Sequence, residues 1–183
     1  MKKVLVISLC LLFITSIFAF EKGTKNIGGS ISYQSQKWNS DTDAASILTI
    51  APHGGYFFID NLCADLLINF LSMDDGYDDK ETGFNFGIGA RYFYNNIYGG
   101  AGFLMQSNSG ESVDDYDGTK YDYNFSANFL NFQLGYLVGL VENVYLDLGF
   151  DYSMGMGEYG GDWTGDNEQS LLNFGAGLDI FFK

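Results

Sequence analysis

The chain has 183 residues, which fits a single domain large enough to bury a core. Asp and Glu number 23 against 9 Lys and Arg, so the formal net charge is -14. This acidic balance excludes nucleic acid as a partner, because phosphate binding needs a basic surface. With 24 Gly, 17 Phe and 13 Tyr but a single Pro, the composition favours strands joined by tight turns over helices.

Residues 1–19 have the pattern of a secretory signal peptide. Lys2 and Lys3 are positively charged, an apolar run follows to Phe18, and Ala19 is a small residue at the predicted cleavage point. The apolar run is shorter than the roughly 20 residues that a membrane-spanning helix needs, which favours a cleaved signal over an uncleaved anchor. The predicted mature domain is therefore 20–183, with Cys63 as its single cysteine and no internal disulfide.

The predicted mature chain alternates with a period of two residues. From 62 to 70, 144 to 156 and 170 to 182, the even-numbered residues are mostly apolar and the odd-numbered ones mostly small or polar. Only an extended strand sorts residues in this way. Eight strands are predicted, at 25–36, 45–58, 62–72, 82–94, 97–107, 123–138, 144–156 and 170–182.

The predicted connections alternate between short and long. Those near 59–61, 95–96 and 139–143 are short, and those near 37–44, 72–81, 107–122 and 157–169 are longer and polar. This rhythm predicts an antiparallel up-and-down sheet with all short turns at one end. A phrase of Gly, aromatic residues and an Asn-containing turn recurs at 55–70, 91–103 and 135–150, and it marks the short-turn end.

The two faces of the predicted strands indicate a barrel turned inside out. One face is small and polar, and there Arg91 can pair with carboxylates such as Asp65 or Asp147. The other face is apolar and would meet lipid, as in a transmembrane β-barrel. The predicted polar network of the lumen is Asp65, Arg91, Asp147, Asp151 and Asp179. A soluble barrel built from a duplicated hairpin is the alternative.

Aromatic residues are predicted to form two bands, one at each membrane interface. The band at the short-turn end is Tyr56, Phe58, Tyr92, Tyr94, Tyr136 and Phe182, and the band toward the long loops is Tyr33, Trp38, Tyr123 and Tyr152.

The predicted mature chain resembles the small eight-stranded outer-membrane β-barrels of bacteria, the group that includes OmpX-like, OmpW-like and OmpA-barrel proteins. The most specific feature is the C-terminus, where Gly177, Ile180 and Phe182 match the assembly signal of that group, while Lys183 adds one residue beyond it. The resemblance implies an all-β transmembrane antiparallel up-and-down barrel of eight strands. It further implies the outer membrane of a Gram-negative-type bacterium as location, and outer-membrane lipid, lipopolysaccharide and the barrel-assembly machinery as partners.

No residue pattern predicts catalysis or a cofactor. His53 is the single histidine, and an interior hydrogen bond explains it more simply than a Ser-His-acid hydrolase. Asp147 and Asp151 face the same way and could form a carboxylate pair, but neutralised lumen acids are the favoured interpretation. Pro52 lies inside a predicted strand, so local distortion is expected there.

Most acidic residues lie in the long loops, where they favour either contact with divalent cations or simple solvation. They are Asp41, Asp43, Asp74, Asp75, Asp78, Asp79, Glu81, Glu111, Asp114, Asp115, Asp117, Glu158, Asp162, Asp166 and Glu168. The stretch 113–118 resembles a calcium loop, but Val113 stands where the first ligand belongs, so no metal site is predicted. The predicted function is structural or surface-interacting and non-enzymatic, with a narrow pore or transport barrel for small, even hydrophobic, solutes as the alternative.

Overall fold

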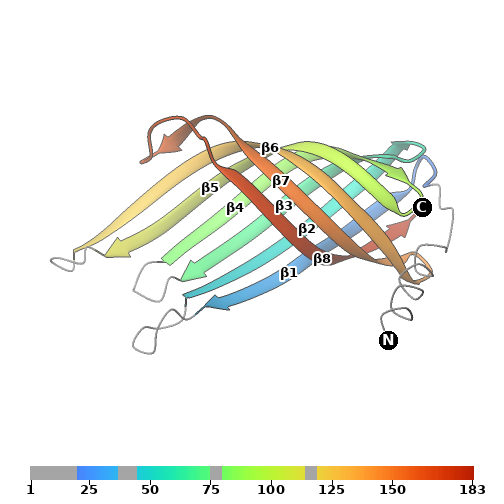
Figure 1. Cartoon of the computed structure of the whole chain (residues 1–183), viewed down its shortest axis with the longest axis horizontal. Helices are drawn as coiled ribbons and strands as arrows, with labels where there is room; N and C mark the ends of the chain where they lie inside the picture. The colour runs from blue at the N-terminus through green and yellow to red at the C-terminus, as the bar shows by residue number, and fades with distance from the viewer. Residues whose placement is uncertain (1–19, 37–44, 75–79, 114–118) are drawn as a thin grey trace, which may run out of the picture.

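The computed structural model describes residues 20–36, 45–74, 80–113 and 119–183, which form an antiparallel β-barrel (Figure 1). Each strand pairs with the next in sequence, and β1 pairs with β8 to close the ring. The predicted all-β, eight-stranded, up-and-down architecture is confirmed. The strands are β1 (Lys25–Gln36), β2 (Ala45–Ile59), β3 (Leu62–Asp74), β4 (Lys80–Tyr94), β5 (Ile97–Val113), β6 (Lys120–Val141), β7 (Val144–Gly161) and β8 (Ser170–Phe182).

Strands β5, β6 and β7 are longer than predicted. Pairing of β5 with β6 continues to Val113↔Lys120, so much of 107–122, predicted as a loop, is strand. The side chains there are polar, and the sequence pattern of an apolar face therefore ends before the strand does. Backbone hydrogen bonds hold a ladder together without an apolar face, which explains why polarity alone gave the wrong boundary.

The barrel is apolar outside and polar within, as the alternation predicted. Outward side chains such as Ile88, Leu134 and Phe174 are 61%, 56% and 77% exposed. Inward side chains such as Arg91 and Asn131 are each only 3% exposed. The apolar surface of this molecule therefore lies on the outside of its wall.

The predicted outward position is wrong for one member of the aromatic bands, Tyr123. Tyr123 lies on the inner face of β6, where its hydroxyl donates a hydrogen bond of 3.0 Å to Glu81 Oε2. Its ring lies against Gly110 of β5, which leaves room for it. Trp38, a second member of that band, lies outside the described residues.

The strands are staggered around the ring. Following the paired residues from Leu171 of β8 through β7 and onward to β1 returns to β8 at Phe181, a shift of ten residues. Such a stagger accompanies strands tilted by roughly 35–45° to the barrel axis. Because of the tilt, residues that are not paired with each other across neighbouring strands can lie at the same height along the barrel axis and face each other in the lumen.

Each of the three short turns contains an asparagine in the left-handed region of φ. Asn61, Asn95 and Asn143 have φ values of 63°, 53° and 63°. Among residues with a side chain, Asn and Asp are the ones that adopt this conformation most often, which makes Asn suited to tight hairpins. The turn geometry therefore explains the asparagine of the repeated phrase.

Pro52 interrupts the sheet where distortion was expected. Pairing between β2 and β3 runs to Ile50↔Phe70 and resumes at His53↔Leu67 with the register unchanged. Proline has no backbone N–H to donate to the ladder, which explains the gap. Among the described residues there is no helix whose length and hydropathy would let it cross a membrane.

Candidate functional site

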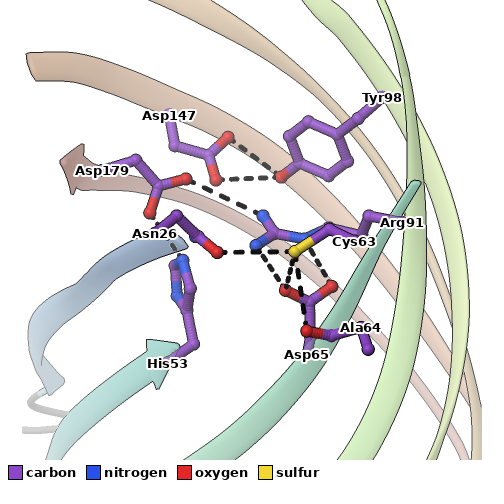
Figure 2. A network of polar contacts seen from close by, with 9 residues as sticks. All are labelled: Asn26, His53, Cys63, Ala64, Asp65, Arg91, Tyr98, Asp147 and Asp179. Carbon is purple, nitrogen blue, oxygen red and sulfur yellow. Dashed lines mark hydrogen bonds and ion pairs between the residues drawn. The ribbon is translucent and has the colours of Figure 1, made fainter. Parts of the chain in front are cut away.

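A polar network crosses the lumen near the short-turn end, and Arg91 of β4 is at its centre (Figure 2). Arg91 Nε donates a hydrogen bond of 2.8 Å to Asp65 Oδ2 on β3, and Arg91 Nη2 donates one of 2.8 Å to Asp65 Oδ1. The side chains of Arg91 and Asp65 are 3% and 1% exposed. A buried bidentate pair of this kind fixes both side chains in one geometry.

Asp179 of β8 joins the network by lying between Arg91 of β4 and His53 of β2. Its Oδ2 lies 3.7 Å from Arg91 Nη1, and its Oδ1 lies 2.6 Å from His53 Nε2 on β2. The interaction that the sequence favoured for His53, an interior hydrogen bond, is thus present. Within the described part of the chain, the side chain that is hydrogen-bonded to the His53 ring is Asp179 and not a serine.

Asp147 of β7 is held by a tyrosine. Its two oxygens accept hydrogen bonds of 2.9 and 3.0 Å from the Tyr98 hydroxyl on β5. The Arg91 guanidinium lies over the rings of Tyr98 and Phe93, at 5.1 and 5.4 Å from their centroids. Tyr98 therefore links the two side chains, because its hydroxyl binds Asp147 and its ring lies under the Arg91 guanidinium. The rings of Tyr98 and Phe93 also attract the Arg91 charge by cation–π interaction.

Two glycines make room for the network. A Cβ atom at Gly55 would lie 2.2 Å from Asn26 Oδ1 and 2.4 Å from Cys63 Sγ. At Gly28 it would lie 1.8 Å from Asp179 Oδ1. Any larger residue at these positions would displace a member of the network, so these glycines relieve a crowded lumen.

An aromatic cluster closes the barrel between this network and the short turns. Phe20 stacks on Phe181 and Phe57, with ring centroids 4.3 and 5.0 Å apart, and contacts Phe93 edge-on at 5.1 Å. Phe57 and Phe93 have no exposed surface, and Phe181 is 3% exposed. We call the buried rings of Phe20, Phe57, Phe93, Tyr145 and Phe181 the aromatic plug.

The backbone of Phe20 is anchored on the first short turn. Its N–H donates to Asn61 Oδ1 at 2.9 Å, and its carbonyl accepts from the Asn61 N–H at 2.8 Å. The following residues continue the attachment, because Gly23 donates to the Phe57 carbonyl at 2.8 Å. The segment before β1 therefore lies across the barrel end with the Phe20 ring inserted.

The predicted lumen residues are distributed over the site as follows. Asp65, Arg91, Asp147 and Asp179 converge in the network, whereas Asp151 lies on the inner face of β7 opposite Gln133 and Asn173. In the predicted assembly signal, Ile180 and Phe182 face outward and are 44% and 46% exposed. Gly177 faces inward, where a Cβ would lie 2.8 Å from the Gly29 carbonyl oxygen.

The sequence interpretation missed the aromatic plug and the role of Tyr98. A usable signal was present, because consecutive aromatic residues in a strand must point to opposite faces. In Phe57-Phe58, Phe93-Tyr94 and Phe181-Phe182, the first ring is buried inside and the second is exposed outside. These pairs predict one ring for the lumen and one for the outer surface.

Among the residues that the structure describes, no group of three or more His, Cys, Asp or Glu is arranged to hold a metal ion. Several loop acids lie outside that part of the chain, at positions 41, 43, 75, 78, 79, 114, 115 and 117.

The β7–β8 connection is described, and there Asn167 Nδ2 donates to the Asn128 carbonyl at 2.9 Å. This connection folds back onto β6.

Comparison with known proteins supports the fold. The chain is similar to the crystal structure of Neisserial surface protein A (NspA), with a TM-score of 0.50 and 15% sequence identity over 89% of this chain and 98% of that one. At this identity the likeness shows a shared eight-stranded barrel fold. No family model matches the chain, and no curated protein matches it. Membership of the OmpX-like or OmpW-like group stays a prediction.

Proposed function

We propose that this small barrel is an integral outer-membrane protein that does not catalyse a reaction and does not conduct along its axis. Its role would be structural, or the display of acidic loops to partners outside the cell. The single observation that carries the proposal is the combination of an apolar outer wall with a lumen sealed by side chains.

The outer wall supports insertion into a bilayer. Large apolar side chains are exposed on every strand, at positions that in a soluble barrel would be polar. At the short-turn end, Tyr56, Tyr92 and Tyr94 are 46%, 53% and 69% exposed, as expected for rings at a membrane interface. The similar structure, NspA, is named a surface protein, which accords with this proposal.

Two seals in series support a closed bore. The Arg91–Asp65–Asp179 network spans the lumen, and the aromatic plug lies between it and the short-turn opening. An ion moving along the axis would have to break a buried ion pair and then displace packed rings. A pore for solutes along the axis is therefore the less supported of the two functions.

The C-terminal pattern and the loops suggest the partners. Gly177, Ile180 and Phe182 would present the assembly signal to the barrel-assembly machinery. The acidic loops would interact with lipopolysaccharide through bridging divalent cations, since carboxylate oxygens are preferred ligands of Ca²⁺. Both partners follow from the resemblance and from charge.

The test has two parts, applied to protein purified from membranes. A folded barrel should enter the detergent-solubilised membrane fraction and migrate faster on a gel before boiling than after it. The same protein in planar bilayers should give no conductance steps, whereas a known porin in the same bilayer gives them. A freely water-soluble monomer would refute the membrane role, and reproducible single-channel steps would refute the closed bore.

A further inference from the structure

The charges in and beside the polar network do not cancel. The carboxylates on this part of the inner face are Asp65, Asp147, Asp151 and Asp179. Among the residues that the structure describes, the basic side chains there are Arg91 and His53. Arg91 is paired with Asp65, and His53 with Asp179. Even with His53 protonated, two carboxylates therefore remain without a basic partner of their own.

These two carboxylates differ in their surroundings. Both oxygens of Asp147 accept hydrogen bonds from Tyr98, whose ring lies under the Arg91 guanidinium (Figure 2). Asp151 lies further along β7, on the long-loop side of the network, and it is half-buried. Within the described part of the chain, no hydrogen bond reaches its carboxylate. A carboxylate withdrawn from water in this way needs a counter-charge.

A buried amide oxygen next to Asp151 also lacks a partner. Asn131 of β6 is 3% exposed, and its Nδ2 donates a hydrogen bond of 3.0 Å to Ser153 Oγ on β7. This bond fixes the amide, so its oxygen points away from Ser153 and into the lumen. Asn131 Oδ1 is buried and accepts no hydrogen bond in the described structure. Buried polar atoms are nearly always paired, so this oxygen indicates a bound group.

The strand register brings the two unpaired groups together. Gln133 of β6 is opposite Asp151, and Asn131 is opposite Ser153, so Asn131 and Asp151 are diagonal neighbours on the inner face. Diagonal neighbours lie about 7–8 Å apart, which lets two side chains of this length direct oxygens to a common point. Both groups are acceptors, so neither satisfies the other. The group that completes them must donate hydrogen bonds or carry positive charge.

The chemistry of these side chains selects a small hard cation. Asp151 supplies a carboxylate, Asn131 an amide oxygen and Ser153 a hydroxyl oxygen, and oxygen ligands of this kind suit alkali and alkaline-earth ions. A single carboxylate among neutral oxygens matches an ion of single charge. A divalent ion usually draws on several carboxylates, and the described residues offer no such cluster.

We propose that Asp151, Asn131 and Ser153 form a binding site for an alkali cation, Na⁺, in the long-loop half of the lumen. The half-buried Asp151 is reached by an ion from the long-loop side. Beyond the site, the charge of Arg91 repels a cation and the aromatic plug blocks its way. The ion is therefore held in the lumen as part of the folded barrel and is not conducted through it.

The site is tested by urea unfolding of the protein in lipid vesicles, with NaCl replacing choline chloride at constant ionic strength. Choline is too large to fit between neighbouring side chains. For one bound ion near saturation, a tenfold rise in Na⁺ should lower the unfolding equilibrium constant about tenfold. Asp151→Asn and Asn131→Ala should each remove this dependence on Na⁺. The control Asp122→Asn, which alters an exposed carboxylate at the start of β6, should keep it.

The dependence on Na⁺ is measured within each variant, so a change in the variant's own stability does not affect the comparison. Equal unfolding of the wild type in NaCl and choline chloride would overturn the site, and this holds even where a variant does not fold. Unfolding that responds to pH or to Ca²⁺ but not to Na⁺ would also overturn it, because a proton or a divalent ion would then compensate Asp151. A dependence on Na⁺ that survives both substitutions would place the ion elsewhere.

Discussion

At the scale of single residues, Arg91 connects more of the molecule than any other described side chain in the network. It binds Asp65 of β3, lies near Asp179 of β8 and covers the ring of Tyr98 on β5. A charge buried to this degree is tolerable because its partners are fixed around it. The energetic consequence is asymmetric, since removing one partner leaves the other charge uncompensated.

We expect Asp65→Asn to lower the free energy of unfolding by about 3–5 kcal/mol, because Arg91 would keep its charge without its principal partner. The measurement is equilibrium unfolding by urea in lipid vesicles. Arg91→Met should cost a similar amount, and the double variant should lose clearly less than the two single losses together.

The matched control is Asp122→Asn, which removes an exposed carboxylate at the start of β6 and should change stability by no more than about 0.5 kcal/mol. Additive losses in the double variant would show that the two side chains act independently, contrary to this interpretation.

At the scale of elements, the hairpins are set by backbone conformation at their short turns. Asn143 has a φ of 63°, and its carbonyl accepts a hydrogen bond of 2.9 Å from the Phe181 N–H. The conformation is thus coupled to the position of a ring in the aromatic plug. The Asn143 side chain matters here mainly because asparagine allows the backbone to adopt a positive φ.

Asn143→Val should therefore destabilise the barrel by about 1–2 kcal/mol, because a β-branched residue is strained at positive φ. Asn143→Gly should stay close to the wild type, since glycine adopts this region freely. Urea unfolding of the refolded proteins gives both values. The neighbouring change Glu142→Val is the control and should have little effect, and an equal loss there would contradict the backbone explanation.

At the scale of the whole molecule, the barrel has two unlike ends. The short-turn end is compact and plugged by aromatic rings, and the described acidic residues at the other end include Asp74, Glu81, Glu111, Glu158, Asp162, Asp166 and Glu168. In the proposed orientation the compact end faces the periplasm. The acidic end then faces the outside, where divalent cations and lipid head groups are accessible.

A membrane-impermeant maleimide should label Glu168→Cys but not Glu142→Cys in intact cells, and both after the outer membrane is permeabilised. Both residues are exposed, one in the β7–β8 connection and one in a short turn. The buried Cys63 provides the unlabelled background. Labelling of the short turn alone would reverse the orientation, and labelling of both in intact cells would refute the membrane barrier between them.

Much of the fold follows from local periodicity. Alternation along β3, β7 and β8 marked both faces, and the asparagine-containing turns marked one end of the barrel. The far ends of β5 and β6 could not be predicted in this way, because the side chains beyond the apolar wall are polar although the backbone that carries them is still paired. The inward position of Tyr123 was missed because an aromatic residue is compatible with either face.

The candidate site was predictable in its composition and not in its connections. Strand alternation put Asp65, Arg91, Asp147 and Asp179 on the inner face. The stagger of the strands, which the sequence does not state, decides that Arg91 pairs with Asp65 while Asp147 pairs with Tyr98.

The class of fold, the number of strands, the apolar outside and the polar inside follow from the order of residues along the chain, because each depends on residues near one another in that order. The position of the Phe20 ring inside the barrel and the length of the pairing between β8 and β1 became known only from the folded chain. Both involve contacts between the two ends of the chain. Such contacts depend on how the whole ring closes, and no local pattern of residues records that.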